Sequence, residues 1–143
     1  MTNRNTHEDI DTVSEELDEL SSTLMGDALN VLAEGDSMGV LVVIQDDVGE
    51  VASYEFVDDG PQALLDGARA CIRKSRHGVR YALTYVGAIE MEDGTYAEAL
   101  IMEFGERGKR SYSAYSLFEG AGTGDAFRWT DPAPAGEEEP LLG

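Results

Sequence analysis

The chain has 143 residues, 42% of them hydrophobic, which is enough for one domain with a packed core. Its 29 acidic and 10 basic residues give a net charge of −19, which disfavours direct binding to nucleic acids or anionic membranes. Its single cysteine, Cys71, excludes a disulfide scaffold and a zinc ribbon, and no stretch approaches the roughly 20 apolar residues of a membrane-spanning helix. Because the N-terminus also lacks the apolar region of a signal peptide, we expect a cytoplasmic protein.

A long amphipathic helix is the first predicted element. Residues 1–5 are expected to be frayed, and apolar residues then recur at spacings of three and four from Ile10 to Leu32. Thr6 is the expected N-cap, and Gly35 is expected to end the helix. The apolar stripe predicts packing on a sheet, and its near-heptad spacing also allows a coiled-coil dimer.

Two strands and a second helix are predicted next. The β-branched run of residues 37–45 is typical of a strand buried on both faces, and the alternation in residues 50–57 of a half-exposed antiparallel strand. A helix is expected from Pro61 onward, with Asp58 or Asp59 as its cap. Its buried stripe is expected to comprise Leu64, Leu65, Ala68, Cys71 and Ile72.

The clearest local signal is the pair Asp93-Gly94 between two long alternating runs, which predicts a β-hairpin with a two-residue turn. Setting Asp93 opposite Gly94 places Tyr85 opposite Met102 and assigns every side chain to one of two faces. The bulky face is expected to form the core beneath both helices, and it comprises Tyr81, Leu83, Tyr85, Ile89, Met91, Tyr96, Leu100, Met102 and Phe104.

The opposite face of this hairpin is small and apolar, and neither helix remains to cover it. An uncovered apolar face on a soluble domain usually marks an interface, so we expect a homodimer. The candidate dimer face comprises Ala82, Thr84, Ala88, Ala97, Ala99 and Ile101.

The rest of the chain predicts two further strands and a tail. The strands are expected over residues 109–118 and 126–130, and residues 131–143, rich in Pro, Gly and Glu, are predicted to be a disordered acidic tail. Residues 6–130 are therefore expected to form a single α+β domain, an antiparallel sheet packed with two helices in the order helix-strand-strand-helix-strand-strand-strand. No family motif is recognised, and the element order alone resembles that of Roadblock-type dimerisation domains and of small acidic secretion chaperones.

The glycine-rich segment 119–125, EGAGTGD, is the only candidate nucleotide loop. It lacks the lysine and Ser/Thr of a P-loop, its glycine spacing differs from that of a dinucleotide loop, and strand-like residues follow it. The two histidines, His7 and His77, have no evident carboxylate partner, and no His or Cys pair has metal-ligand spacing. The sequence therefore predicts no catalytic residue, no cofactor and no metal, and EGAGTGD is interpreted as a flexible link.

Basic residues are confined almost entirely to the middle of the chain, where they are expected to meet at one end of the sheet. Such a basic pole could bind an anion, an acidic segment of a partner, or the acidic first helix of a second copy. Complementation of the helix dipole and solubility are the alternative explanation. The basic pole comprises Arg73, Lys74, Arg76, His77, Arg80, Arg107, Lys109 and Arg110.

These observations favour a non-enzymatic protein-binding or assembly module, with a protein partner and a homodimer as the expected assembly. An acidic mimic of nucleic acid, which inhibits a DNA-binding protein, is the alternative. A small enzyme with an unobvious site is the third hypothesis.

Overall fold

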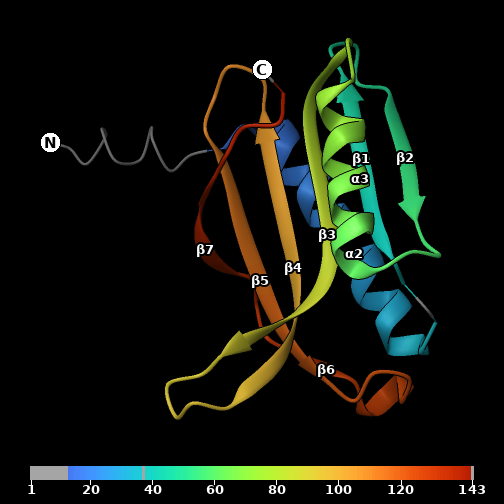
Figure 1. Cartoon of the computed structure of the whole chain (residues 1–143), viewed down its shortest axis with the longest axis vertical. Coiled ribbons are helices and arrows are strands. Elements are labelled where there is room, and N and C mark those ends of the chain that lie inside the picture. The colour runs from blue at the N-terminus through green and yellow to red at the C-terminus, as the bar shows by residue number, and fades with distance from the viewer. Residues whose placement is uncertain (1–12, 37, 143) are drawn as a thin grey trace, which may run out of the picture.

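The computed structural model describes residues 13–36 and 38–142. Figure 1 shows the arrangement of its elements. In chain order these are α2 (Glu15–Glu34), β1 (Val40–Asp46), β2 (Val51–Phe56), α3 (Pro61–Arg73), β3 (Gly78–Glu90), β4 (Tyr96–Glu106), β5 (Ser111–Glu119), the 3₁₀ turn η1 (Gly124–Ala126), β6 (Arg128–Trp129) and β7 (Ala133–Glu138).

The strands form one curled antiparallel sheet in the order β2-β1-β3-β4-β5, with β6 and β7 both paired to β5. The predicted α+β class and the order of its first seven elements are confirmed. The expectation that both helices cover one face is wrong, because α2 and α3 lie on opposite sides of the sheet (Figure 1). Within the described residues, no helix combines the length and apolar character needed to traverse a bilayer.

Helix α2 begins where the side chain of Ser14 caps it, its Oγ accepting the N–H of Leu17 at 3.0 Å. It ends at Gly35, whose φ of 82° is the left-handed conformation expected of a helix-terminating glycine. The expected cap at Thr6 and the frayed residues 1–5 lie outside the described residues. Of the predicted apolar stripe, Val13 precedes the helix and Val31 is half-buried. The buried members are Leu17, Leu20, Leu24, Ala28 and Leu32.

Helix α3 packs on the other face, chiefly against β1. Ala68 and Ile72 are fully buried there, beside Val42 of β1. Its N-cap is Gly60 rather than either predicted aspartate, and Pro61 occupies the first turn as expected.

The β3–β4 hairpin forms where predicted, but its register is shifted by one residue. Met91 donates its N–H to the carbonyl of Thr95 at 2.7 Å, and Glu90 pairs with Tyr96. The loop therefore has three residues and ends on Gly94, whose φ is 86°. Because side chains alternate along a strand, this shift moves every β4 side chain to the face opposite the predicted one.

The predicted dimer face is consequently wrong, because its residues do not lie on one face of the sheet. Ala82 faces α2, whereas Ile101 pairs with Tyr85 and lies on the α3 face with Ala97 and Ala99. The bulky face is divided in the same way, because Leu100 and Met102 pack with α2 rather than with Tyr85. No uncovered small face results: Ala82, Thr84 and Ala99 each have 0% of their surface exposed.

The predicted disordered tail is also wrong. Residues Ala133–Glu138 form β7 on the outer edge of β5, where they supply hydrogen-bond partners that this edge otherwise lacks. Leu141 and Leu142 then pack into the α3-side core with Ile72 and Tyr81, with 4% and 2% of their surface exposed. The tail is therefore part of the fold.

The EGAGTGD loop has a structural role at the end of α2. The N–H of Gly122 donates to the carbonyl of Leu32 at 2.9 Å, and this carbonyl also accepts the N–H of Gly35 at 3.1 Å, so the loop adds a second donor at the helix terminus. A Cβ on Gly35 would lie 2.8 Å from the Cα of Gly122, so glycine permits this close approach of two backbones.

Candidate functional site

Strand β2 forms an open edge of the sheet. It is the terminal strand, paired only with β1, and all of its residues except Phe56 are exposed. The hydrogen bond from the N–H of Asp46 to the carbonyl of Glu50, 2.9 Å long, sets the alternation of the ladder. By that alternation Ala52 and Tyr54 bond to β1.

The outward-facing residues of β2 are therefore Val51, Ser53 and Glu55. Their peptide groups point away from β1, and no described strand pairs with them. Unpaired edges of this kind are templates for a strand from another chain, and proteins usually shorten, cover or bulge them. Here the edge is six residues long and regularly paired on its inner side.

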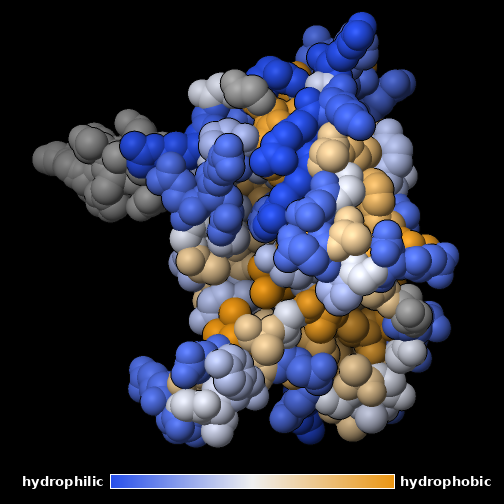
Figure 2. All heavy atoms as spheres, viewed as in Figure 1, coloured by the Kyte–Doolittle hydropathy of each residue, from blue (hydrophilic) through white to orange (hydrophobic). Residues whose placement is uncertain are grey.

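Exposed apolar side chains gather at the same place. Eight large hydrophobic side chains are exposed among the described residues, and half of them belong to β2 or to the turns that flank it. Figure 2 shows that hydrophilic side chains cover the end of the molecule near the C-terminus, whereas hydrophobic ones reach the surface below α3. The four at the β2 edge, with their exposed fractions, are Val48 (77%), Val51 (49%), Tyr54 (45%) and Val57 (46%).

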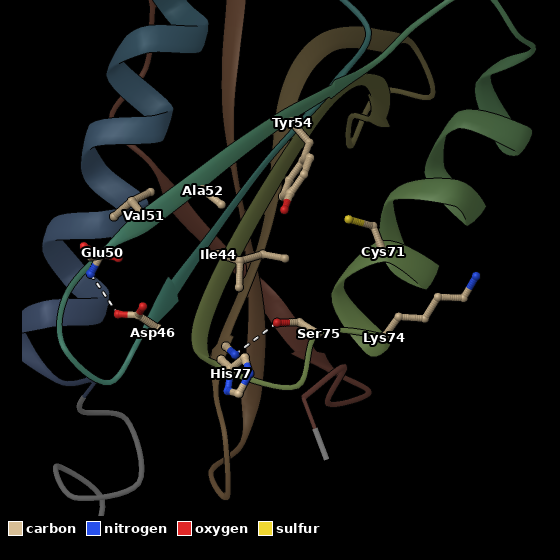
Figure 3. A pocket seen from close by; sticks show the side chains of 11 residues that line it. Ile44, Asp46, Glu50, Val51, Ala52, Tyr54, Cys71, Lys74, Ser75 and His77 are labelled. Atoms are coloured by element: carbon tan, nitrogen blue, oxygen red, sulfur yellow. Dashed lines mark hydrogen bonds between the residues drawn. The ribbon is translucent and has the colours of Figure 1, made fainter.

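A groove of about 430 Å³ runs along the α3 side of this edge (Figure 3). Ile44 and Ala52 supply apolar walls, Tyr54 hangs from β2 into the groove, and the thiol of Cys71 points toward it from α3 (Figure 3). The side chain of Lys74 extends away from these groups (Figure 3). The groove therefore offers an apolar middle with polar groups at its end.

A second groove, of about 380 Å³, lies on the α2 side of the same strand. The buried side chains of Leu20, Leu24 and Val43 line its base, and Val51 and Ser53 contribute from β2. Its rim on α2 is acidic and exposed, and it comprises Glu16, Glu19 and Asp27. The β2 edge is thus flanked by one groove on each face of the sheet.

The polar groups of the first groove are engaged in holding turns. The carboxylate of Asp46 accepts the N–H groups of Val48 and Glu50, and Ser75 Oγ accepts the N–H of Gly78 at 3.0 Å. The ring of His77 lies beside the α3–β3 turn, apart from Cys71 (Figure 3). Among the described residues, no three His, Cys, Asp or Glu side chains are grouped to hold a metal ion. Asp46 and Ser75 therefore stabilise the two turns beside this groove.

A partly buried ion pair joins α3 to the sheet and was not predicted from the sequence. Arg69 donates from Nε to Glu103 Oε1 at 3.1 Å and from Nη2 to Oε2, and Tyr85 also reaches Oε2. Hydrogen bonding to Glu103 raises the pKa of Arg69. Burial, and then the charge of Glu103, raises the pKa of Tyr85 to about 12. An acid between the apolar residues Met102 and Phe104, with an arginine in the preceding helix, is the signal that the sequence offers.

The basic pole does gather at one end of the sheet, but acids neutralise much of it. Arg80 and Lys109 both lie within 4.0 Å of the Glu106 carboxylate. The guanidinium of Arg107 donates to the carbonyl of Gly78, at 3.0 Å from Nε and 2.9 Å from Nη2, and so holds the α3–β3 turn.

The tail neutralises two further members of the basic pole. Arg73 lies 3.9 Å from Glu139, and Arg110 lies 3.9 Å from Glu137. Of the other predicted members, Lys74 and His77 line the α3-side groove, and Arg76 is exposed. The protein's own acidic C-terminal segment therefore pairs with part of the basic pole.

No protein-family model matches the chain, and searches of curated proteins and of solved structures found no match.

Proposed function

We propose that this protein is a non-enzymatic protein-binding module that receives an extended segment of a partner along β2. The observation that carries the proposal is the coincidence of an open strand edge with half of the exposed large hydrophobic side chains. Added strands gain main-chain hydrogen bonds from such an edge, and pockets for alternate side chains supply specificity. The grooves on the two faces of β2 are placed for this second role.

Site-specific photo-crosslinking in the native host tests the proposal. A benzophenone side chain at Glu55, on the β2 edge, is compared with the same group at Glu92, in the exposed β3–β4 turn. We expect a discrete protein adduct from position 55 alone. Adducts that are the same from both positions would contradict a specific partner site.

The substitution Ser53→Pro distinguishes strand addition at the β2 edge from non-specific adsorption of other proteins. Its ring removes an N–H that faces away from β1, so the inner ladder is kept while a new strand loses a donor and meets a steric block. Ser53→Ala is the matched control. We expect the adduct at position 55 to disappear with Ser53→Pro and to persist with Ser53→Ala. An adduct that Ser53→Pro leaves unchanged would mean that the partner does not pair with the β2 edge.

A further inference from the structure

We infer that the segment bound along β2 is basic at alternate positions and apolar at the positions between them. This inference rests on the proposed function and adds the chemistry of the partner. Side chains of an added strand alternate between the two faces of the sheet, so one set enters the α2-side groove and the other enters the α3-side groove.

The α2-side groove selects positive charge. Glu16, Glu19 and Asp27 form its rim, and Glu55 projects to the same face from the edge itself. The described residues up to 68 contain no lysine or arginine, and Arg80, which donates to Gln45 in the lining of this groove, is itself paired with Glu106. An aliphatic stem with a charged head fits this groove, because the stem can cover Leu20 and Leu24 while the head reaches the rim.

The α3-side groove selects apolar side chains. Ile44, Ala52, Tyr54 and Cys71 line it at the level of the strand, and the ring of Tyr54 is 45% exposed there. An apolar side chain from an added strand would cover this ring. The two grooves together therefore predict alternation of basic and apolar residues rather than a uniformly basic segment.

A second copy of the chain fits this edge poorly. Two β2 strands paired antiparallel about Ser53 would set Glu55 opposite Val51 and bring together the acidic turns at their ends. Two bodies of charge −19 would also approach one another. Basic partner segments avoid both penalties and gain from attraction during encounter.

Peptide binding tests the inference directly. The probe is a labelled peptide of about seven residues in which lysine alternates with valine, measured by fluorescence anisotropy at about 0.02 and 0.2 M salt. One control peptide replaces lysine with glutamate. Another has the same composition with the lysines and valines in two blocks. We expect the alternating basic peptide to bind more tightly than either control.

Substitutions at the β2 edge and at the acidic rim test which of the two surfaces the peptide contacts. Ser53→Pro is expected to weaken binding at least about tenfold, and Ser53→Ala to leave it unchanged. The triple variant Glu16→Gln, Glu19→Gln, Asp27→Asn keeps the edge and removes the rim charges. It is expected to weaken binding and to reduce its dependence on salt.

The outcomes separate this inference from the proposed function. If the glutamate peptide binds as tightly, or the triple variant binds normally, the charge inference is overturned while strand addition stands. If Ser53→Pro binds normally, the peptide adsorbs to the acidic surface and the inference is overturned. If no peptide binds, the inference is overturned as well, and the crosslinking result then decides the proposed function alone.

A measurement on the wild-type protein tests the inference even if the Ser53→Pro variant does not fold. Addition of the basic peptide is expected to slow amide hydrogen exchange at Val51, Ser53 and Glu55, whose N–H groups face outward. No slowing at these three positions would overturn the inference. A wild-type dimer in sedimentation that Ser53→Pro dissociates would assign the edge to a second copy and would also overturn it.

Discussion

The guanidinium of Arg69 on α3 donates two hydrogen bonds to the carboxylate of Glu103 in the middle of β4. The side chain of Glu103 is 5% exposed and that of Arg69 is 27% exposed. The two partners are therefore unequal, because Glu103 is buried almost completely whereas Arg69 is partly exposed to water. This pair connects α3, which forms one wall of the α3-side groove, to β4, which lies two strands away from β1 in the sheet.

This inequality predicts unequal mutational effects. Arg69→Met leaves a buried carboxylate without its partner and is expected to lower the free energy of unfolding by about 3–5 kcal/mol. Glu103→Gln keeps a hydrogen-bond acceptor and lets Arg69 turn to solvent, so its cost is expected to be smaller. The measurement is urea denaturation of both variants and of the double variant Arg69→Met/Glu103→Leu, which is expected to recover most of the loss. Equal costs for the two single variants would contradict this account of the pair.

Tyr85 predicts a pH dependence at the alkaline end. Burial, and then Glu103, raises its pKa to about 12, above the ordinary tyrosine value of about 10. Its neutral form is thus favoured in the folded state, so its contribution to stability is complete below about pH 10 and is lost as the pH rises toward 12. The free energy of unfolding should fall less steeply in this range for Tyr85→Phe than for the wild type. Parallel slopes would contradict the raised pKa.

The tail is expected to be required for stability. Truncation after Pro132 removes β7 and the buried Leu141 and Leu142, and it should lower the free energy of unfolding by at least about 4 kcal/mol. The full-length variant Leu141→Ser/Leu142→Ser should lose much of the same stability. Glu139→Gln is the control, because this side chain is 83% exposed and its ion pair contributes little. Thermal unfolding measures all three. A truncated chain that melts with the wild type would show that the tail is not docked.

Gly94 is expected to be required in the β3–β4 turn for its backbone alone. Its φ of 86° is unfavourable for a β-branched residue, and a Cβ placed on it meets no atom within 4 Å. Gly94→Val should therefore lower the free energy of unfolding by about 1–3 kcal/mol, and Gly94→Asn by less, because asparagine tolerates this conformation. Chemical denaturation compares the two. A valine variant as stable as the wild type would contradict the positive φ of Gly94 in this turn.

The hairpin illustrates what the sequence could and could not predict. Asp93-Gly94 identified the turn and the positive φ of Gly94, because both are local properties of the backbone. The register was wrong by one residue because Asp93 accepts the N–H and hydroxyl of Thr95, which favours a three-residue loop over the two-residue one. That single residue decided which side chains of β4 face α2, and with it the existence of the predicted dimer face.

The sequence did not predict the docked tail or the β2 site, and the reason differs from that for the hairpin. Composition indicates disorder when a segment has few apolar residues, and Leu141 and Leu142 stand at the far end of a Pro- and Glu-rich stretch. Their docking depends on the unpaired edge of β5 and on a space beside Tyr81, which only the assembled sheet provides. The β2 edge was recognised as half-exposed, but strand order is needed to see that it is terminal.

Amide hydrogen exchange within β2 of the free protein tests the central claim most directly. If the edge is open, the amides of Ala52 and Tyr54 exchange slowly, because they bond to β1, and those of Val51, Ser53 and Glu55 exchange rapidly. NMR resolves these five amides individually. The account predicts this alternation in dilute, monomeric protein. Slow exchange at both Ser53 and Glu55 under those conditions would mean that the edge is already paired, and it would contradict the proposal that β2 receives a partner.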